Sequence, residues 1–433
     1  MKKSALLLVV LVVASFSFVS CGSSPSALTN RVLASQSVSS TTASPGLVLI
    51  NGHDDQLMRG TISAGNAPGL MALTPDRTLV LAFDSSSNNV EVINSVRQSQ
   101  EGNIQLPGAT TSMVALASGS AYAAVPTAPM NNGPSPGAVE VLNITSGGIT
   151  ATLSVPAAQT VVSSPDGSHL LAFSNDSDVV TVIYPLLVNL STPTTATVAG
   201  FDRPVNAVFS ADGGTAYILN CGPECGSGSA SASMQTLDIA TLTVGTPVAV
   251  DGATIGWLSG STLYVAGTPT ASVSNPAPNN SCPATTNAKT CGRLDVVDVS
   301  SPTMTVTSSN VITDGYHDRI DMSINGQLFI GSYTCTNIGN VNNPQGGEVR
   351  GCLSIYNTTN GAVVIPPDNG DVTGFQSFTT RDVEYVAEGG NLRVYDTLID
   401  SLLLDNSNNP NLPETGTIVI TGHIIDVKAI DFF

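Results

Sequence analysis

An all-β repeat protein is predicted by three observations on the sequence. First, Val161–Tyr184 (VVSSPDGSHLLAFSNDSDVVTVIY) holds three apolar runs of strand length, separated by turns rich in Ser, Asn, Asp and Gly. Second, similar units recur along nearly the whole chain. Third, charged residues make up only 11% of the sequence, and no long amphipathic helical pattern is visible. Together these features indicate short strands joined by tight turns.

The repeat length predicts the architecture. Counterparts of the Ser164 turn recur at spacings of 44 to 46 residues and, where loops are inserted, at 49 to 64 residues. They begin at Thr74, Ser118, Ser210, Ser259 and Ser323, with a weaker copy at Phe378. A period near 45 residues with four short strands is typical of one β-propeller blade. A β-sandwich or a β-helix is the alternative, but neither has a reason to repeat its turn chemistry at constant spacing.

The two ends of the chain complete one another. Arg31–Ser40, Gly46–Asp54 and Gln56–Gly65 have the pattern of second, third and fourth strands of a blade that lacks its first. His423–Phe433 has the pattern of a first strand that lacks the other three. We therefore predict a β-propeller of eight four-stranded antiparallel blades, closed by N-terminal strands that pair with the C-terminal strand. Seven blades is the alternative, if the weak unit near Phe378 is incomplete.

A resemblance to known families supports this fold. The SPDG turn at 164–167 and the strands LAFSN (171–175), AYILN (216–220) and LYVAG (263–267) resemble the bacterial propellers named for a Tyr-Val-Thr-Asn strand and the lactonase-type propellers related to them. The resemblance covers roughly residues 30–433. It implies the fold and says almost nothing about activity, since one fold hosts many functions.

The first 30 residues have the pattern of an export signal and a tether. Two lysines precede the apolar run Ala5–Val13, which is too short for an ordinary membrane span. The junction FVSC ends at Cys21 and resembles the lipobox of bacterial lipoproteins, whose cysteine carries the lipid. Ordinary secretory cleavage with Cys21 as a free thiol is the alternative. We expect a signal peptide at 1–20, a lipidated Cys21 and tether at 21–30, and one propeller domain at 31–433.

These features predict a protein held at a bacterial envelope by lipid alone. Gly22, rather than Asp, follows the cysteine, which by resemblance to bacterial sorting patterns indicates the outer membrane; periplasmic and surface exposure both stay open. The formal net charge of −18 predicts repulsion from nucleic acid and from anionic lipids. The tether Gly22–Asn30 reaches at most roughly 30 Å, so the face of the disc where the chain enters is expected to lie toward the lipid.

The cysteine count agrees with export. Seven cysteines are present, and assigning Cys21 to lipid leaves six in an oxidising compartment. Proximity favours three local disulfides, each between the second and third strands of three consecutive blades: Cys221–Cys225, Cys282–Cys291 and Cys335–Cys352. A zinc site is the rival interpretation, but the spacing CGPEC is not CxxC and no histidine lies nearby in sequence.

One set of polar residues is expected to converge at the mouth of the channel. Loops that precede first strands share a face with the cysteine loops, and they carry candidate ligand-binding residues in equivalent places: Arg203, Asn206, Tyr316, His317, Asp318, Arg319, His423 and Asp426. Such a set could bind an anionic or sugar-like ligand, and a metal in the mouth is the further alternative. The structural alternative is that these residues only cap strands and pair with one another.

Two classes of function follow. The sequence has no GxSxG elbow, HExxH, phosphate loop or dinucleotide fingerprint, so no catalytic residue and no cofactor is predicted. The favoured interpretation is a binding or scaffold protein for an envelope protein, a glycan or a small ligand. The alternative is a lactonase-like or other hydrolase that uses a charged or metal site in the mouth.

Overall fold

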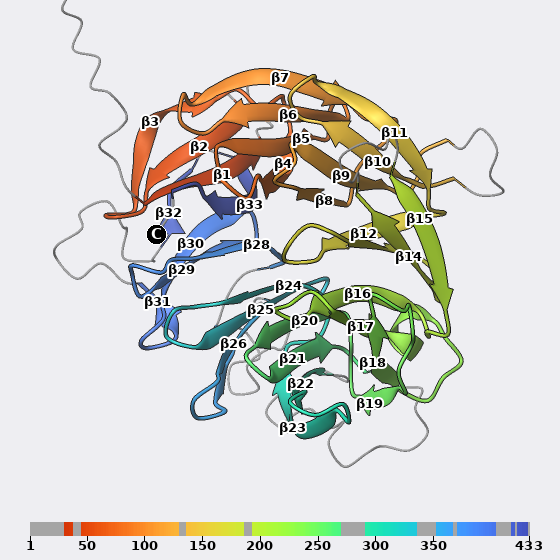
Figure 1. Cartoon of the computed structure of the whole chain (residues 1–433). Coiled ribbons are helices and arrows are strands. Elements are labelled where there is room, and N and C mark those ends of the chain that lie inside the picture. Colours follow the sequence, from red (N-terminus) through yellow and green to blue (C-terminus); the bar gives the residue numbers. More distant parts are fainter. Residues whose placement is uncertain are drawn as a thin grey trace, which may run out of the picture.

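The computed structural model describes residues 30–37, 45–129, 136–185, 193–269, 291–335, 352–366, 370–403, 417–420 and 422–431. These residues form eight antiparallel sheets arranged in a ring as the blades of a propeller (Figure 1). The all-β class and the count of eight blades are confirmed. The weak unit that begins near Phe378 belongs to a complete blade, so the seven-blade alternative is wrong.

We number the blades along the chain. Blade 1 comprises β4 (Pro68–Leu73), β5 (Leu79–Asp84), β6 (Asn89–Asn94) and β7 (Ser99–Gln105). Blade 2 comprises β8 (Ser112–Ala115), β9 (Ser120–Val125), β10 (Ala138–Asn143) and β11 (Gly148–Ser154). Blade 3 comprises β12 (Ala158–Ser163), β13 (Leu170–Ser174), β14 (Val179–Tyr184) and β15 (Thr194–Ala199). Blade 4 comprises β16 (Pro204–Phe209), β17 (Thr215–Asn220), β18 (Ala232–Asp238) and β19 (Val248–Val250), with the 3-10 turn η2 (Gly222–Cys225) between β17 and β18.

The remaining blades follow the same order. Blade 5 comprises β20 (Ile255–Ser259), β21 (Thr262–Gly267), β22 (Gly292–Asp298) and β23 (Thr305–Ile312). Blade 6 comprises β24 (Tyr316–Met322), β25 (Gln327–Tyr333), β26 (Leu353–Asn357) and β27 (Val363–Val364). Blade 7 comprises β28 (Val372–Ser377), β29 (Val383–Glu388), β30 (Asn391–Asp396) and β31 (Ser401–Leu402), and β32 (Thr417–Ile418) pairs with β30. The closing blade comprises β33 (His423–Ala429), β1 (Arg31–Ser37), β2 (Gly46–Asn51) and β3 (Gln56–Ile62).

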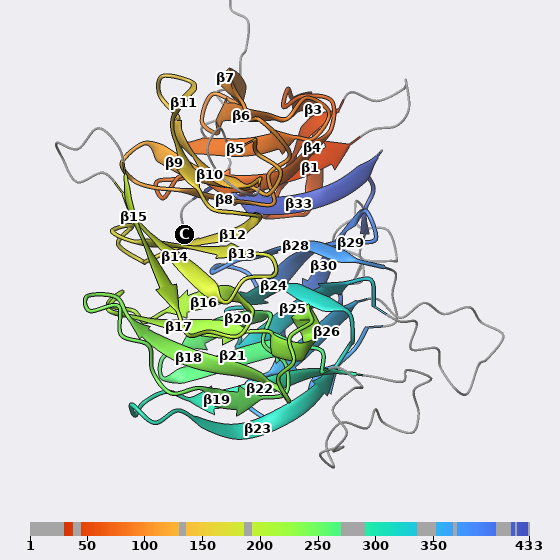
Figure 2. The same ribbon diagram turned by 90° about the vertical axis from the view of Figure 1, so that its right-hand side faces the viewer.

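The first strand of each blade faces the centre of the ring, and β3, β7, β11, β15, β19 and β23 lie at its periphery (Figure 1). Because the sheets are antiparallel, every first and third strand runs the same way through the disc, which Figure 2 shows from the side. We call the face where first strands begin the mouth face, and the face where they end the rear face. Loops between second and third strands therefore open on the mouth face.

The core lies between blades rather than within one centre. Buried apolar side chains form eight clusters, and each cluster joins two neighbouring blades. The alternation of side chains along a strand explains this arrangement. In β1, Val32 and Ala34 pack toward blade 7, whereas Leu33 between them packs toward blade 1.

The two ends of the chain close the ring as predicted. β1 pairs antiparallel with β33, with Val32 opposite Ala429 and Ala34 opposite Val427. Arg31 fixes this junction, because its Nε and Nη2 donate to Asp431 Oδ1 at 2.9 and 2.8 Å. Within the described residues we find no helix with the length and apolar character that a membrane crossing requires.

Candidate functional site

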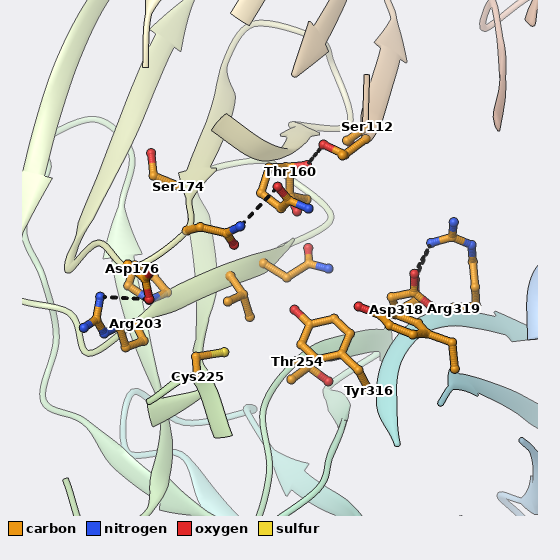
Figure 3. A pocket seen from close by; sticks show the side chains of 17 residues that line it. Ser112, Thr160, Ser174, Asp176, Arg203, Cys225, Thr254, Tyr316, Asp318 and Arg319 are labelled. Atoms are coloured by element: carbon orange, nitrogen blue, oxygen red, sulfur yellow. Dashed lines mark hydrogen bonds and ion pairs between the residues drawn. The ribbon is translucent and has the colours of Figure 1, made fainter. Parts of the chain in front are cut away.

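A pocket of about 420 Å³ opens on the mouth face, and Figure 3 shows the side chains that line it. Its wall comes from five consecutive blades, 2 to 6: from the inner strands and the residues before them, and from the ends of second strands and the loops that follow them in blades 3, 4 and 6. The lining is mostly polar: Thr111, Ser112, Gln159, Thr160, Ser174, Asn175, Asp176, Arg203, Pro204, Val205, Asn206, Cys225, Thr254, Tyr316, Asp318, Arg319 and Tyr333. The structure thus brings together five of the eight predicted site residues.

Register shifts in the inner strands shape this wall. In each of β12, β16 and β24, one residue has no partner on the second strand of the blade. These unpaired residues are Gln159, Val205 and Asp318, respectively. All three skipped residues line the pocket, as do the residues that follow them. A bulge releases a residue from the strand ladder and re-aims its side chain. The same irregularity in three blades therefore turns successive side chains toward the mouth.

Two arginine–aspartate pairs hold the charged groups of the pocket, as Figure 3 shows. Arg203 Nη1 lies 3.6 Å from Asp176 Oδ1, and Arg319 Nη1 lies 3.0 Å from Asp318 Oδ2. Arg203 has a left-handed backbone conformation with φ of 54°, and its carbonyl accepts the Cys221 N–H at 3.0 Å. The disulfide loop of blade 4 therefore holds this arginine in place. The four charges cancel, so the wall favours a ligand without a large net charge.

Blade 6 supplies an aromatic corner. The rings of Tyr316 and Tyr333 are 5.4 Å apart, and both line the pocket. Burial, together with nearby Tyr333, Glu224 and Asp318, raises the pKa of the Tyr316 hydroxyl, which therefore keeps its proton. Burial also raises the pKa of Asp318, and the Arg319 guanidinium opposes that shift. The corner offers ring faces and hydroxyl groups to a ligand.

Glu224 is an acidic residue beside the pocket that the sequence reasoning missed. It lies in η2, next to Cys225 in the pocket wall, and its Oε2 accepts the Thr268 N–H at 2.9 Å. Burial raises the pKa of Glu224 to about 8, so its carboxyl group is largely protonated at neutral pH. The sequence CGPEC shows only an acid inside a short disulfide loop, and nothing local predicts that the residue is half-buried against Thr268 of blade 5.

Three predicted site residues lie outside the pocket wall. His317 is a residue of β24 and is fully buried. Its Nε2 lies 3.0 Å from the Thr313 carbonyl oxygen, and burial lowers the pKa of the ring to about 4, so the ring is neutral. His423 is exposed at the start of β33. Asp426 is buried, where it accepts the Met71 N–H at 2.9 Å and pairs with Lys428 Nζ at 2.7 Å. None of the three therefore lines the pocket: His317 and Asp426 are buried, and His423 is exposed at the mouth-face end of β33.

Two of the three predicted disulfides are confirmed. Cys221–Cys225 and Cys335–Cys352 form disulfides between the second and third strands of blades 4 and 6. Cys291 is also disulfide-bonded, and both its expected partner Cys282 and the predicted lipid site Cys21 lie outside the described residues. Across the described ranges, no group of three or more His, Cys, Asp and Glu side chains could hold a metal ion.

Comparison with known proteins identifies the fold and nothing narrower. No family model matches the sequence, and no curated protein matches it. A dihydro-heme d1 dehydrogenase, NirN, aligns with a TM-score of 0.60 at 9% identity over 93% of this chain and 75% of its own. A putative 6-phosphogluconolactonase from Bacteroides uniformis aligns with a TM-score of 0.52 at 12% identity over 92% and 99%. The propeller domain of Cps50 (Swd1) from Myceliophteria thermophila aligns with a TM-score of 0.51 at 10% identity over 76% and 96%.

Proposed function

We propose that this chain is a lipid-anchored envelope protein that binds a small polar ligand, such as a sugar or a glycan end, in the mouth pocket. The observation that carries the proposal is the composition of the wall, where amide side chains, hydroxyls and two balanced Arg–Asp pairs surround about 420 Å³ beside a pair of tyrosines. Planar amides and ion pairs donate and accept at once, as a polyhydroxylated ligand requires. Aromatic rings cover its apolar faces.

Calorimetric titration of the purified protein tests this proposal. The probes are a panel of free monosaccharides, uronic acids and aldonolactones. At least one should bind, and Gln159→Ala and Asn206→Ala should each weaken it about three- to tenfold, as expected for the loss of one net hydrogen bond. Thr236→Ala is the matched control, because Thr236 lines a separate groove between blades 4 and 5. Binding that is unaffected by both pocket variants would overturn the assignment of the site.

Hydrolysis is the second candidate, and one observation favours it. Glu224 is a carboxylic acid beside the pocket whose raised pKa of about 8 suits a proton donor at neutral pH. One structural neighbour is named as a putative 6-phosphogluconolactonase, a likeness that extends to the fold alone. Incubating the protein with the aldonolactones of the panel distinguishes the candidates. Turnover that is lost in Glu224→Gln while binding persists would favour the hydrolase; binding without turnover supports the binding protein.

A further inference from the structure

The exposed apolar side chains are concentrated on one face of the disc. Among the described residues, eight large hydrophobic side chains are exposed, and only Tyr333 and Val419 lie on the mouth face. Four of the other six lie in rear-face turns, and Leu57 and Ile149 are the second residues of the outer strands β3 and β11, next to such turns: Leu57 (43% exposed), Val96 (61%), Ile149 (38%), Ile324 (53%), Leu398 (63%) and Ile399 (67%). We call these six residues the apolar arc. Single exposed hydrophobics are ordinary, but a cluster on one face indicates an interaction surface.

The apolar arc spans five consecutive blades of the ring. Its residues belong to blades 6 and 7, the closing blade, and blades 1 and 2, which are consecutive neighbours in Figure 1. Hydrogen bonds join the turns that carry them. The Asn325 amide, next to Ile324, donates to Thr397 Oγ1 at 2.9 Å, next to Leu398. Arg31 Nη1 donates to the Ser95 carbonyl, next to Val96, at 3.3 Å.

The start of the described chain lies in the middle of this arc. The Asn30 carbonyl accepts the Gly52 N–H at 2.6 Å in the closing blade, and its side chain contacts Thr380 Oγ1 at 3.5 Å in blade 7. Asp382, in the same turn as Thr380, accepts from Asn325 at 2.8 Å. Residues 1–29 therefore join the body on the rear face, between the two flanks of the arc.

Charge does not attract the rear face to lipid. In the half that carries the arc, the described turns hold Arg77, Arg97 and Arg381 together with more acidic residues: Asp54, Asp55, Asp76, Asp382, Asp396 and Asp400. In blades 3 to 5, the described rear-face turns carry Asp166, Asp212, Asp238 and Asp298 and neither lysine nor arginine. The basis for docking is therefore the apolar side chains of the arc and not its charge.

We propose that the apolar arc docks on a zwitterionic phospholipid surface, with its turn residues in the headgroup layer and the mouth pocket facing away. The inference rests on the proposed anchoring through Cys21, which would hold the rear face at the membrane. Shallow burial of a few apolar side chains binds a bilayer weakly alone and firmly when a lipid chain supplies a second attachment. Docking also keeps the mouth open to ligands from the aqueous side.

Tryptophan fluorescence on phosphatidylcholine vesicles tests the docking. The chain has a single tryptophan, so Ile399→Trp and Val96→Trp each add one reporter on a flank of the arc. Val419→Trp is the matched control, because Val419 is equally exposed on the mouth face (72%). With the full chain bound to vesicles, the two arc reporters should shift to shorter wavelength and be quenched by brominated phosphatidylcholine. Val419→Trp should do neither.

Loss-of-contact variants complete the test. Leu398→Ser combined with Ile399→Ser should lower vesicle partitioning roughly tenfold or more, with an unchanged melting temperature. Val419→Ser should leave partitioning unchanged. Arc reporters that stay in water on vesicle-bound protein would overturn the docking, as would a double-serine variant that only dissociates a dimer. If Cys21→Ser sediments with vesicles as the parent does and its arc reporters are still quenched, the anchoring is wrong and the docking is supported.

Discussion

A buried glutamate between blades 6 and 7 makes stability depend on pH in an unusual direction. Glu384 is fully buried, and neither of its carboxylate oxygens has a donor within the described structure. It faces Asp321, whose oxygens already accept the Met322 and Ser377 N–H groups at 2.8 and 3.0 Å. Burial, and then the charge of Asp321, raise the pKa of Glu384 well above its usual value.

The direction in which stability changes with pH follows from proton linkage. Folding keeps a proton on Glu384 that the unfolded chain releases near pH 4.5, so the contribution to stability is present below that pH and is lost as pH rises toward the folded pKa. The slope is about 1.4 kcal/mol of unfolding free energy per pH unit for one proton. Glu384→Gln places a permanent N–H donor against Asp321. It should therefore remove this slope and make the protein more stable than the parent at pH 8.

Urea unfolding at several pH values between 5 and 8 measures the effect. The free energy of unfolding of the parent minus that of Glu384→Gln should change steadily with pH. Glu101→Gln, at an exposed glutamate, should have the same pH dependence as the parent. The difference is the informative quantity, because Glu224 and Asp295 also have pKa values raised by burial, to about 8 and 6, and contribute to both proteins. A difference that is constant with pH would refute the proton held on Glu384.

Three further predictions concern the closure and the anchor. Asp431→Asn should lower the free energy of unfolding by about 1–3 kcal/mol in urea titrations, because it weakens the hydrogen bonds from Arg31 that join the two ends of the ring. Arg381→Gln should cost about 3–5 kcal/mol, since it leaves the buried Asp55 without the guanidinium that pairs with it at 2.7 Å; a loss below 1 kcal/mol would contradict this. Cys21→Ser should release the protein from membranes on fractionation of expressing cells, and a variant that fractionates with membranes like the parent would rule out the lipid anchor.

The sequence alone was sufficient for the architecture, because the signals involved are local. Turn chemistry repeats with each blade. In the Ser164 turn, Asp166 Oδ1 accepts from Ser164 Oγ at 2.6 Å and from the Ser168 N–H at 3.0 Å, and these bonds lower the pKa of Asp166 to about 2. Near-continuous apolar runs then give strands such as β5 and β9 two buried faces, which a ring of stacked blades satisfies. Strand patterns at the two ends of the chain likewise predicted the closing blade, and the proximity of the cysteines in sequence predicted the two described disulfides.

Tertiary structure decided the site, because the site depends on where strands break their register and on which blades meet. Asp318 and Arg319 reach the pocket because β24 skips a residue at Asp318, whereas His317, one position earlier, is turned into the protein. No local pattern in the sequence marks that skip. Glu224 and Glu384 are acidic residues like many others in the chain, and only packing by neighbouring blades raises their pKa. Local interactions therefore determine the repeating unit. Desolvation by neighbouring blades and the register of the strands determine the chemistry of the site.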